Sequence, residues 1–416
     1  MIISDFKKYQ AQTTPFPMSI EVSRAKGSYI FDTNNKKYLD FVAGVSACSL
    51  GHCNDEVIKA IETQSKKYMH VMVYGEFITK PSLELAKLLA KNLPDNLNCT
   101  YFTNSGTEAL EGSMKLARRY TGRKKIIAAK NAYHGSTMGA LTLMGLEERK
   151  KPFEPLIPEV EFIDYNSLVD VSKIDKNTSC VILESIQGSA GFILPKKNYL
   201  KKIKKRCEEV GALLILDEIQ TGIGRTGKLF GFEHFECQPD VIVYGKGLGG
   251  GMPIGAFTAS KKLMDTLHNN PILGHITTFG GNPMITAAAL QTLKIVLNSK
   301  IMVNVLSHEK IIREKLKHRL IKEIRGLGLM MCLIMINEEV ANNLVLRAKE
   351  KGLILFWLLI EKRAVRITPP LTISEKELRE GFDIILDILD NIEWVLISLL
   401  RSLNLQIHFY TNHIYF

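Results

Sequence analysis

The sequence predicts an α/β fold, with a large, mostly parallel sheet and a smaller α+β domain. Two apolar runs, 212–216 and 241–243, carry this prediction, because both are rich in Ile, Val and Leu and lead into polar or glycine-rich residues. Such runs are typical of buried parallel strands. Two further apolar runs, at 125–129 and 180–183, precede these in the chain and alternate with helical patterns. This alternation favours βαβ units.

The rest of the chain predicts the other elements and the domain boundaries. Short strands are expected at 28–32, 37–41, 329–334 and 364–367, and helices from 54, over 80–92 and over 283–320. We expect four parts: an N-terminal segment of the small domain at 1–60, the large domain at 61–300, the rest of the small domain at 301–395, and a tail at 396–416. No role for the tail follows from its residues.

Composition indicates a globular enzyme. A chain of 416 residues is too long for one small core, and 46% hydrophobic with 23% charged residues is ordinary for a soluble protein. The net charge of +11 comes from lysines spread along the chain. In 200–210, for example, they form the solvated face of a helical pattern whose apolar stripe faces inward. We therefore expect no nucleic-acid partner.

Cysteine usage and apolar stretches indicate the compartment. The seven cysteines form no C-x-x-C pair and leave an odd one over, which favours a reducing, cytoplasmic location over a disulfide framework or a zinc site. The amino terminus lacks the basic-then-apolar order of a signal peptide. The longest apolar stretch, 353–360, is too short to span a bilayer. We expect a cytoplasmic protein with no metal and no membrane association.

Two residues at predicted strand ends indicate the chemistry. Asp217 follows the run 212–216, and Lys246 follows 240–245, and a glycine-rich turn comes after each. Parallel sheets bind ligands beyond the carboxyl ends of their strands, where both side chains are expected. A lysine amine can form a Schiff base with the aldehyde of pyridoxal phosphate. A buried carboxylate keeps the pyridine nitrogen protonated, so that the ring draws electrons from a carbanion. Alone, each residue is ordinary, but the pair favours this cofactor.

A phosphate cradle is predicted at the start of a helix. Ser105 as N-cap and Glu108 three residues later form a capping-box pattern. The same turn offers free backbone N–H groups, the hydroxyl of Thr107, and Gly106, which allows close approach. Helix N-termini of this kind bind phosphate because unpaired N–H groups and the helix dipole both favour an anion.

Further candidates lie near other strand ends. Tyr133 and His134 follow a predicted strand, where an aromatic ring can stack on a planar cofactor. Glu184 is a third acid at the same edge, and Thr278 supplies a hydroxyl before a helix. Arg366 ends another strand and offers a planar fork suited to a carboxylate. We count His134 and Glu184 with the cofactor site.

In combination these motifs resemble the class III (ω-amino acid) aminotransferases of the acetylornithine, ornithine and 4-aminobutyrate group. The resemblance extends from about residue 20 to about residue 390. Five motifs match in order and spacing: Ser105–Ala109, Leu216–Gly227, Lys246–Gly251, Thr278–Pro283 and Pro369–Thr372. It implies the type I fold of pyridoxal phosphate-dependent transferases and a homodimer with shared active sites.

The resemblance also implies a role for each site residue. Lys246 would carry the cofactor and move a proton, Asp217 would pair with the pyridine nitrogen, and Gln220 would contact the ring hydroxyl. The other implied contacts are Gly106 and Thr107 to the phosphate, Tyr133 to the ring face, Thr278 to the phosphate of the neighbouring subunit, and Arg366 to the α-carboxylate of the 2-oxo acid or of glutamate.

Two positions depart from the family pattern. Ser136 stands where relatives carry an arginine for the donor carboxylate, and Ser189 stands where they carry a glutamate that masks the Arg366 position. The resemblance implies transfer of an amino group from acetylornithine, ornithine or a related diamino acid to 2-oxoglutarate. The neutral serines keep open a 4-aminobutyrate or ω-amino acid:pyruvate transaminase, or an aminomutase. A non-catalytic cofactor-binding relative is disfavoured, because every chemical position is intact.

Overall fold

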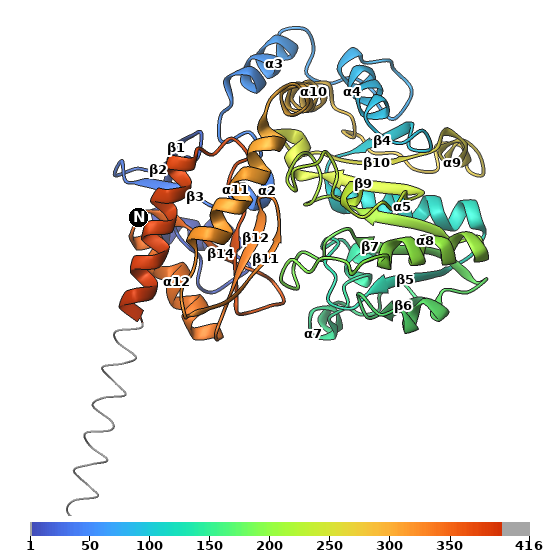
Figure 1. The fold of residues 1–416 in the computed structure, drawn as a ribbon. Coiled ribbons are helices and arrows are strands. Elements are labelled where there is room, and N and C mark those ends of the chain that lie inside the picture. Colours follow the sequence, from blue (N-terminus) through green and yellow to red (C-terminus); the bar gives the residue numbers. More distant parts are fainter. Residues whose placement is uncertain (1, 393–416) are drawn as a thin grey trace, which may run out of the picture.

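The computed structural model describes residues 2–392, so the predicted tail at 396–416 lies outside the described residues. Its largest element is a seven-stranded sheet (Figure 1). In sheet order the strands are β4 (Cys99–Thr103), β10 (Gly255–Ala259), β9 (Val241–Gly245), β8 (Leu213–Asp217), β7 (Thr178–Glu184), β5 (Lys125–Ala129) and β6 (Val160–Ile163). From β9 to β6 every neighbouring pair is parallel, and β10 is antiparallel to β4 and β9. The predicted mostly parallel sheet is confirmed.

Helices cover both faces of this sheet. Alternate strand residues point to opposite sides. Ile215 joins a core cluster with Leu110 of α5 (Gly106–Thr121), whereas Leu216 joins another with Ile203 of α8 (Tyr199–Val210). The strands are therefore apolar on both faces, which explains the continuous Ile, Val and Leu runs in the sequence.

Two four-stranded sheets lie beside the large one. One is antiparallel and consists of β11 (Ile321–Leu327), β12 (Met330–Met335), β15 (Ala364–Ile367) and β14 (Phe356–Trp357). The other contains β1 (Val22–Lys26), β2 (Tyr29–Asp32), β3 (Lys37–Asp40) and β13 (Leu353–Ile354). Because β3 and β13 pair, residues near the amino terminus and residues beyond 350 share a sheet.

The remaining helices surround these sheets. The longer ones are α1 (Ile2–Tyr9), α3 (Asp55–Ser65), α4 (Lys80–Lys91), α12 (Glu338–Glu350) and a helix over 375–392. The short ones are α2 (Ala43–Ser46), α6 (Met138–Thr142), α7 (Glu147–Lys150) and α9 (Lys261–Met264). The 3₁₀ turns are η1 (Lys151–Phe153), η2 (Val169–Lys173), η3 (Gly231–His234), η4 (Lys246–Gly249) and η5 (Asp265–Leu267). Within residues 2–392, every helix is too short or too polar to cross a membrane.

The single helix predicted over 283–320 is wrong. The structure has α10 (Pro283–Asn298), which packs on α3 and α4, and then α11 (Ile301–Lys315). Ser299 adopts an extended conformation and its hydroxyl accepts a hydrogen bond from the Ile301 N–H at 3.3 Å. A serine side chain that bonds nearby backbone competes with helix continuation, and here Ser299 ends α10 and bonds the first N–H of α11.

Candidate active site

The strand ends bring the predicted acids and lysine together. Glu184 ends β7 and Asp217 ends β8, and the two residues are direct partners in the parallel ladder. Lys246 follows β9, the next strand of the sheet. A cavity of about 330 Å³ lies at this edge and is lined by Gly106, Thr107, Tyr133, His134, Gly135, Ser136, Glu184, Ile186, Ser189, Asp217, Ile219, Gln220, Thr221 and Lys246.

Asp217 is held by two hydrogen bonds. Its Oδ2 lies 2.8 Å from Nδ1 of His134, and its Oδ1 accepts from the Ile219 N–H at 2.9 Å. Burial alone would lower the pKa of His134, but its hydrogen bond to Asp217 and the charges of Asp217 and Glu184 outweigh burial, so this pKa is raised. His134 and the Ile219 N–H therefore fix the orientation of the Asp217 carboxylate.

Glu184 lies in a different environment. Its two oxygens accept from the Tyr133 N–H at 3.2 Å and from the Gly188 N–H at 2.8 Å. Burial raises the pKa of Glu184 to about 7. The charge of Asp217 also raises this pKa, whereas His134 and the two N–H groups lower it. Glu184 thus fixes the position of Tyr133 and adds a carboxyl group that titrates near neutral pH.

Lys246 is strained and half-buried. Its backbone φ of +39° lies in the left-handed region, which is unusual for a lysine and common where a functional site holds strain. Burial lowers the pKa of its amine, Asp217 and Glu184 oppose this, and the charge of Arg366 adds to the lowering. The neutral amine, which is the reactive form, is favoured by this environment.

Arg366 of β15 does not line the cavity but lies close enough to act on the lysine. Its guanidinium is buried, and its Nε donates to the Trp357 carbonyl at 3.4 Å. Burial lowers the pKa of Arg366 to about 10. Its Nη1 has no hydrogen-bond partner among residues 2–392. A buried donor of this kind is suited to an incoming carboxylate.

Ser105 and Thr278 also lie outside the cavity lining. Ser105 is the N-cap of α5, with its hydroxyl accepting from the Glu108 N–H at 3.3 Å. The reciprocal half of the predicted capping box is wrong, because the Glu108 carboxylate accepts from the Asn104 N–H at 2.7 Å. That N–H also lacks a helical partner, so Glu108 satisfies it instead. Thr278 is exposed, and its predicted contact with a neighbouring subunit stays a prediction.

The two serines that depart from the family pattern both line the cavity. Ser136 is exposed, and its hydroxyl lies 3.3 Å from the hydroxyl of Tyr133. The carbonyl of Ser189 accepts from the N–H groups of Ile360 at 3.1 Å and Glu361 at 3.2 Å. Both departing positions are therefore uncharged residues of the cavity lining.

The residues present fit pyridoxal phosphate. An amine, a buried carboxylate, an aromatic ring and a helix N-terminus face one cavity, which match the aldehyde, the pyridine nitrogen, the ring face and the phosphate of this cofactor. Gly106 makes the close approach possible, because a Cβ there would fall 2.6 Å from the side chain of Ile219. A larger residue at this position would force the Ile219 side chain or the N-terminus of α5 to shift.

Some lining residues were missed from the sequence. Ile186, Ile219 and Thr221 line the cavity, and Ser46 accepts a hydrogen bond from Nε2 of Gln220 at 3.3 Å. Ile219 follows Asp217 by two residues, so the motif that contains both could have indicated that Ile219 lines the cavity. Ser46 lies 174 residues before Gln220 in the chain, and nothing in its local sequence indicates that it belongs to the site.

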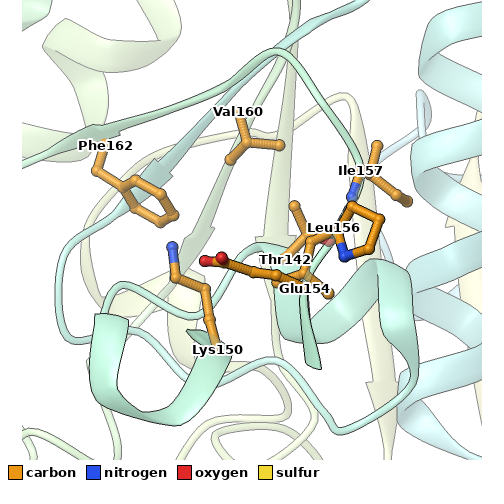
Figure 2. Close-up of a pocket in the computed structure, with 8 residues that line it drawn as sticks. Thr142, Lys150, Glu154, Leu156, Ile157, Val160 and Phe162 are labelled. Carbon is orange, nitrogen blue, oxygen red and sulfur yellow. Dashed lines mark hydrogen bonds between the residues drawn. The ribbon is translucent and has the colours of Figure 1, made fainter. Parts of the chain in front are cut away.

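A larger cavity of about 470 Å³ lies elsewhere, near α7 and β6 (Figure 2). It contains a buried lysine, Lys150, whose Nζ lies 2.6 Å from Glu147 and 4.4 Å from the centre of the Phe162 ring. This amine is already paired, and no predicted site residue lines the cavity. The cavity at Lys246 is therefore identified as the candidate active site by the residues that line it, and not by its size.

Known proteins match the chain over nearly its full length. The family described as "Aminotransferase class-III" matches residues 9–389. The acetylornithine aminotransferase of Caldanaerobacter subterraneus is 39% identical, with 93% of this chain and 99% of that protein covered. The putrescine aminotransferase of Pectobacterium atrosepticum is 37% identical, with 87% and 81% covered. The crystal structure of an ornithine aminotransferase from Toxoplasma gondii superposes with a TM-score of 0.87 at 30% identity, covering 94% of this chain and 95% of that one. The chain therefore belongs to the class III aminotransferases and is a pyridoxal phosphate-dependent aminotransferase.

Proposed function

We propose that this aminotransferase moves an amino group from an ω-amino donor, such as acetylornithine, ornithine or a related diamino acid, to 2-oxoglutarate. The relatives named as acetylornithine and ornithine aminotransferases support the donor class. The choice of acceptor rests on Arg366, a buried guanidinium near Lys246. Its Nη1 has no hydrogen-bond partner within the described chain. Its planar fork suits the α-carboxylate of a 2-oxo acid or of glutamate.

Each residue at the cavity has a distinct task in this proposal. Pyridoxal phosphate, when bound, draws electrons from the carbon next to the amino group. Asp217, held by His134, places a fixed negative charge at the pyridine end of the site. The lowered pKa of Lys246 favours a neutral Nζ, which would take a proton from the donor carbon and return it. Tyr133, whose backbone N–H is held by Glu184, would cover the ring.

A second candidate, an ω-amino acid:pyruvate transaminase, is favoured by the two neutral serines in the cavity lining. Ser136 replaces the arginine that would bind a donor carboxylate, and Ser189 replaces the glutamate that would mask Arg366. Single-turnover assays with a panel of amines, ω-amino acids and diamino acids separate the two candidates. Fast reaction of acetylornithine or ornithine with 2-oxoglutarate supports the first, and preference for pyruvate supports the second.

Restoring the family charge at Ser136 is expected to tighten an ω-amino acid donor. A charge-assisted contact is worth about 1.5–3 kcal/mol, so Ser136→Arg should lower the KM of acetylornithine or 4-aminobutyrate roughly 10- to 100-fold. The KM of glutamate, which uses Arg366, should stay unchanged. Ser172→Arg, at an exposed position of η2 outside the cavity lining, is the matched control for added charge. Unchanged KM values for every donor, or micromolar affinity of the unaltered enzyme for acetylornithine, would contradict this view of the pocket.

We further propose a homodimer with shared sites, in which Thr278 reaches the phosphate of the partner. Exposed apolar side chains gather in the segments around a cavity of about 560 Å³ near Thr278: Phe77, Ile78, Ile272, Leu273 and Ile276. Obligate interfaces bury on the order of 2,000 Å² or more and are apolar. The chain is expected to sediment as a dimer, and Ile78→Glu should dissociate it and abolish activity. Val169→Glu, at another strongly exposed apolar position, should do neither. A monomer that stays active at nanomolar concentration would refute the shared site.

We also propose a cytoplasmic location. All seven cysteines are free thiols in the structure, and Cys180, Cys207, Cys237 and Cys332 are buried. Free thiols are typical of reducing compartments. Fractionation of cells that express the tagged chain tests this proposal.

A further inference from the structure

A carboxylate outside the cavity is linked to the predicted phosphate cradle by side-chain hydrogen bonds. Thr107 lies in the first turn of α5, and Glu111 lies one turn later on the same side of the helix. Thr137, the N-cap of α6, bridges them. Its hydroxyl oxygen lies 2.6 Å from Oε1 of Glu111 and 2.7 Å from the hydroxyl oxygen of Thr107.

The direction of these hydrogen bonds follows from the number of protons. A carboxylate only accepts, so Thr137 donates its single proton to Glu111. Thr107 must then donate its own proton to Thr137. The hydroxyl of Thr107 therefore has no proton left for a phosphate oxygen, and the cradle offers the backbone N–H groups of α5 instead.

The surrounding backbone is arranged around the same carboxylate. Oε1 of Glu111 also accepts from the Ala140 N–H at 3.1 Å, in the first turn of α6. A Cβ at Gly139 would fall 2.2 Å from Oε2 of Glu111, so glycine at this position leaves room for the acid. Glu111 thus ties α5, which carries the cradle, to the segment that leads from Tyr133 into α6.

We propose that Glu111 is a positioning residue for the cofactor phosphate: acting through Thr137, it fixes Thr107 and the first turn of α5 without touching the cofactor. This inference rests on the proposed phosphate cradle. Since the three side chains form one series of hydrogen bonds, removal of any link releases the same turn. Single changes should therefore have similar effects, and combined changes should not add.

The test measures binding of pyridoxamine 5′-phosphate to the apo form of the full chain. This probe carries the ring and phosphate but no aldehyde, so attachment to Lys246 does not contribute. Glu111→Met keeps the volume and removes both acceptors, and is expected to raise Kd roughly 10- to 100-fold, the value of a hydrogen bond to a charged group. Glu111→Gln keeps an acceptor oxygen and should stay within about threefold of the unaltered chain. Glu148→Met, on the exposed surface of α7, is the matched control and should leave Kd unchanged.

Two further measurements separate positioning from a general loss of structure. Thr137→Val should raise Kd as Glu111→Met does, and the double variant should bind no more weakly than either single one. At saturating cofactor, kcat should stay within about threefold of the unaltered enzyme, because the chemistry at Lys246 is untouched. If Glu111→Met does not fold, the Kd of Thr137→Val decides.

The outcomes are distinguishable. Failure of the unaltered chain to bind pyridoxamine 5′-phosphate would overturn the cradle itself, and this inference with it. Normal binding by the unaltered chain together with a Kd within twofold for Glu111→Met and Thr137→Val would overturn the positioning role alone. Additive effects in the double variant would also overturn it, because they would mean two independent contacts.

Discussion

Replacement of Lys246 by alanine is expected to remove essentially all turnover and to leave the fold in place. Lys246 is half-buried, and desolvation lowers the pKa of its amine, so the site favours a reactive neutral amine. Loss of general acid–base transfer alone costs roughly 10²–10⁴-fold, and loss of the covalent link to the cofactor adds to this. Cofactor binding through the N-terminus of α5 should persist, because that helix end does not depend on the lysine.

Two measurements check this expectation. Steady-state turnover with an amino donor and 2-oxoglutarate should fall to background, and borohydride reduction followed by mass spectrometry should find no cofactor covalently attached. Lys262→Ala, an exposed lysine of α9, is the control and should retain full activity. Activity of the Lys246→Ala variant within tenfold of the unaltered enzyme would show that the lysine is not the catalytic amine.

The meeting of Lys246 with Asp217 was predictable from the sequence because topology determines it. Each follows an apolar run, and neighbouring parallel strands end at the same edge of a sheet. The same reasoning placed Glu184 beside Asp217 in the ladder. Buried parallel strands are the most readable elements of this chain, since both of their faces are apolar.

Contacts between distant segments were not predictable in the same way. The bond from Gln220 to Ser46 and the link from Thr107 through Thr137 to Glu111 depend on how loops return to the sheet, which no local pattern encodes. The break after Asn298 was missed for a different reason. The apolar pattern continues through it, while the hydroxyl of one serine ends the helix.

The change Asp217→Asn is expected to preserve the fold and to slow the chemical step roughly 100- to 1,000-fold, the cost of removing one preorganised electrostatic group from an active site. The amide is the same size, and its oxygen can still accept from the Ile219 N–H. What disappears is the negative charge. Without it, the raised pKa of His134 loses its main support, since the hydrogen bond and the charge of Asp217 are what outweigh burial. The imidazole should then titrate at lower pH.

Single-turnover rates and the titration of His134 therefore give two independent measurements of the effect of losing the charge at Asp217. In Asp217→Asn, the rate should fall while the NMR-detected pKa of His134 drops. His134→Gln, which removes the partner but keeps the carboxylate, should lose far less rate. Asp240→Asn is the matched control, because that acid accepts from the Leu214 N–H and pairs with Lys204 at the other end of the strands. It should cost stability without slowing the chemical step. Suppose instead that Asp217→Asn reacts as fast as the unaltered enzyme while the pKa of His134 drops as expected. The carboxylate would then serve only to hold the histidine, and electron withdrawal in this site would not depend on a charge at Asp217.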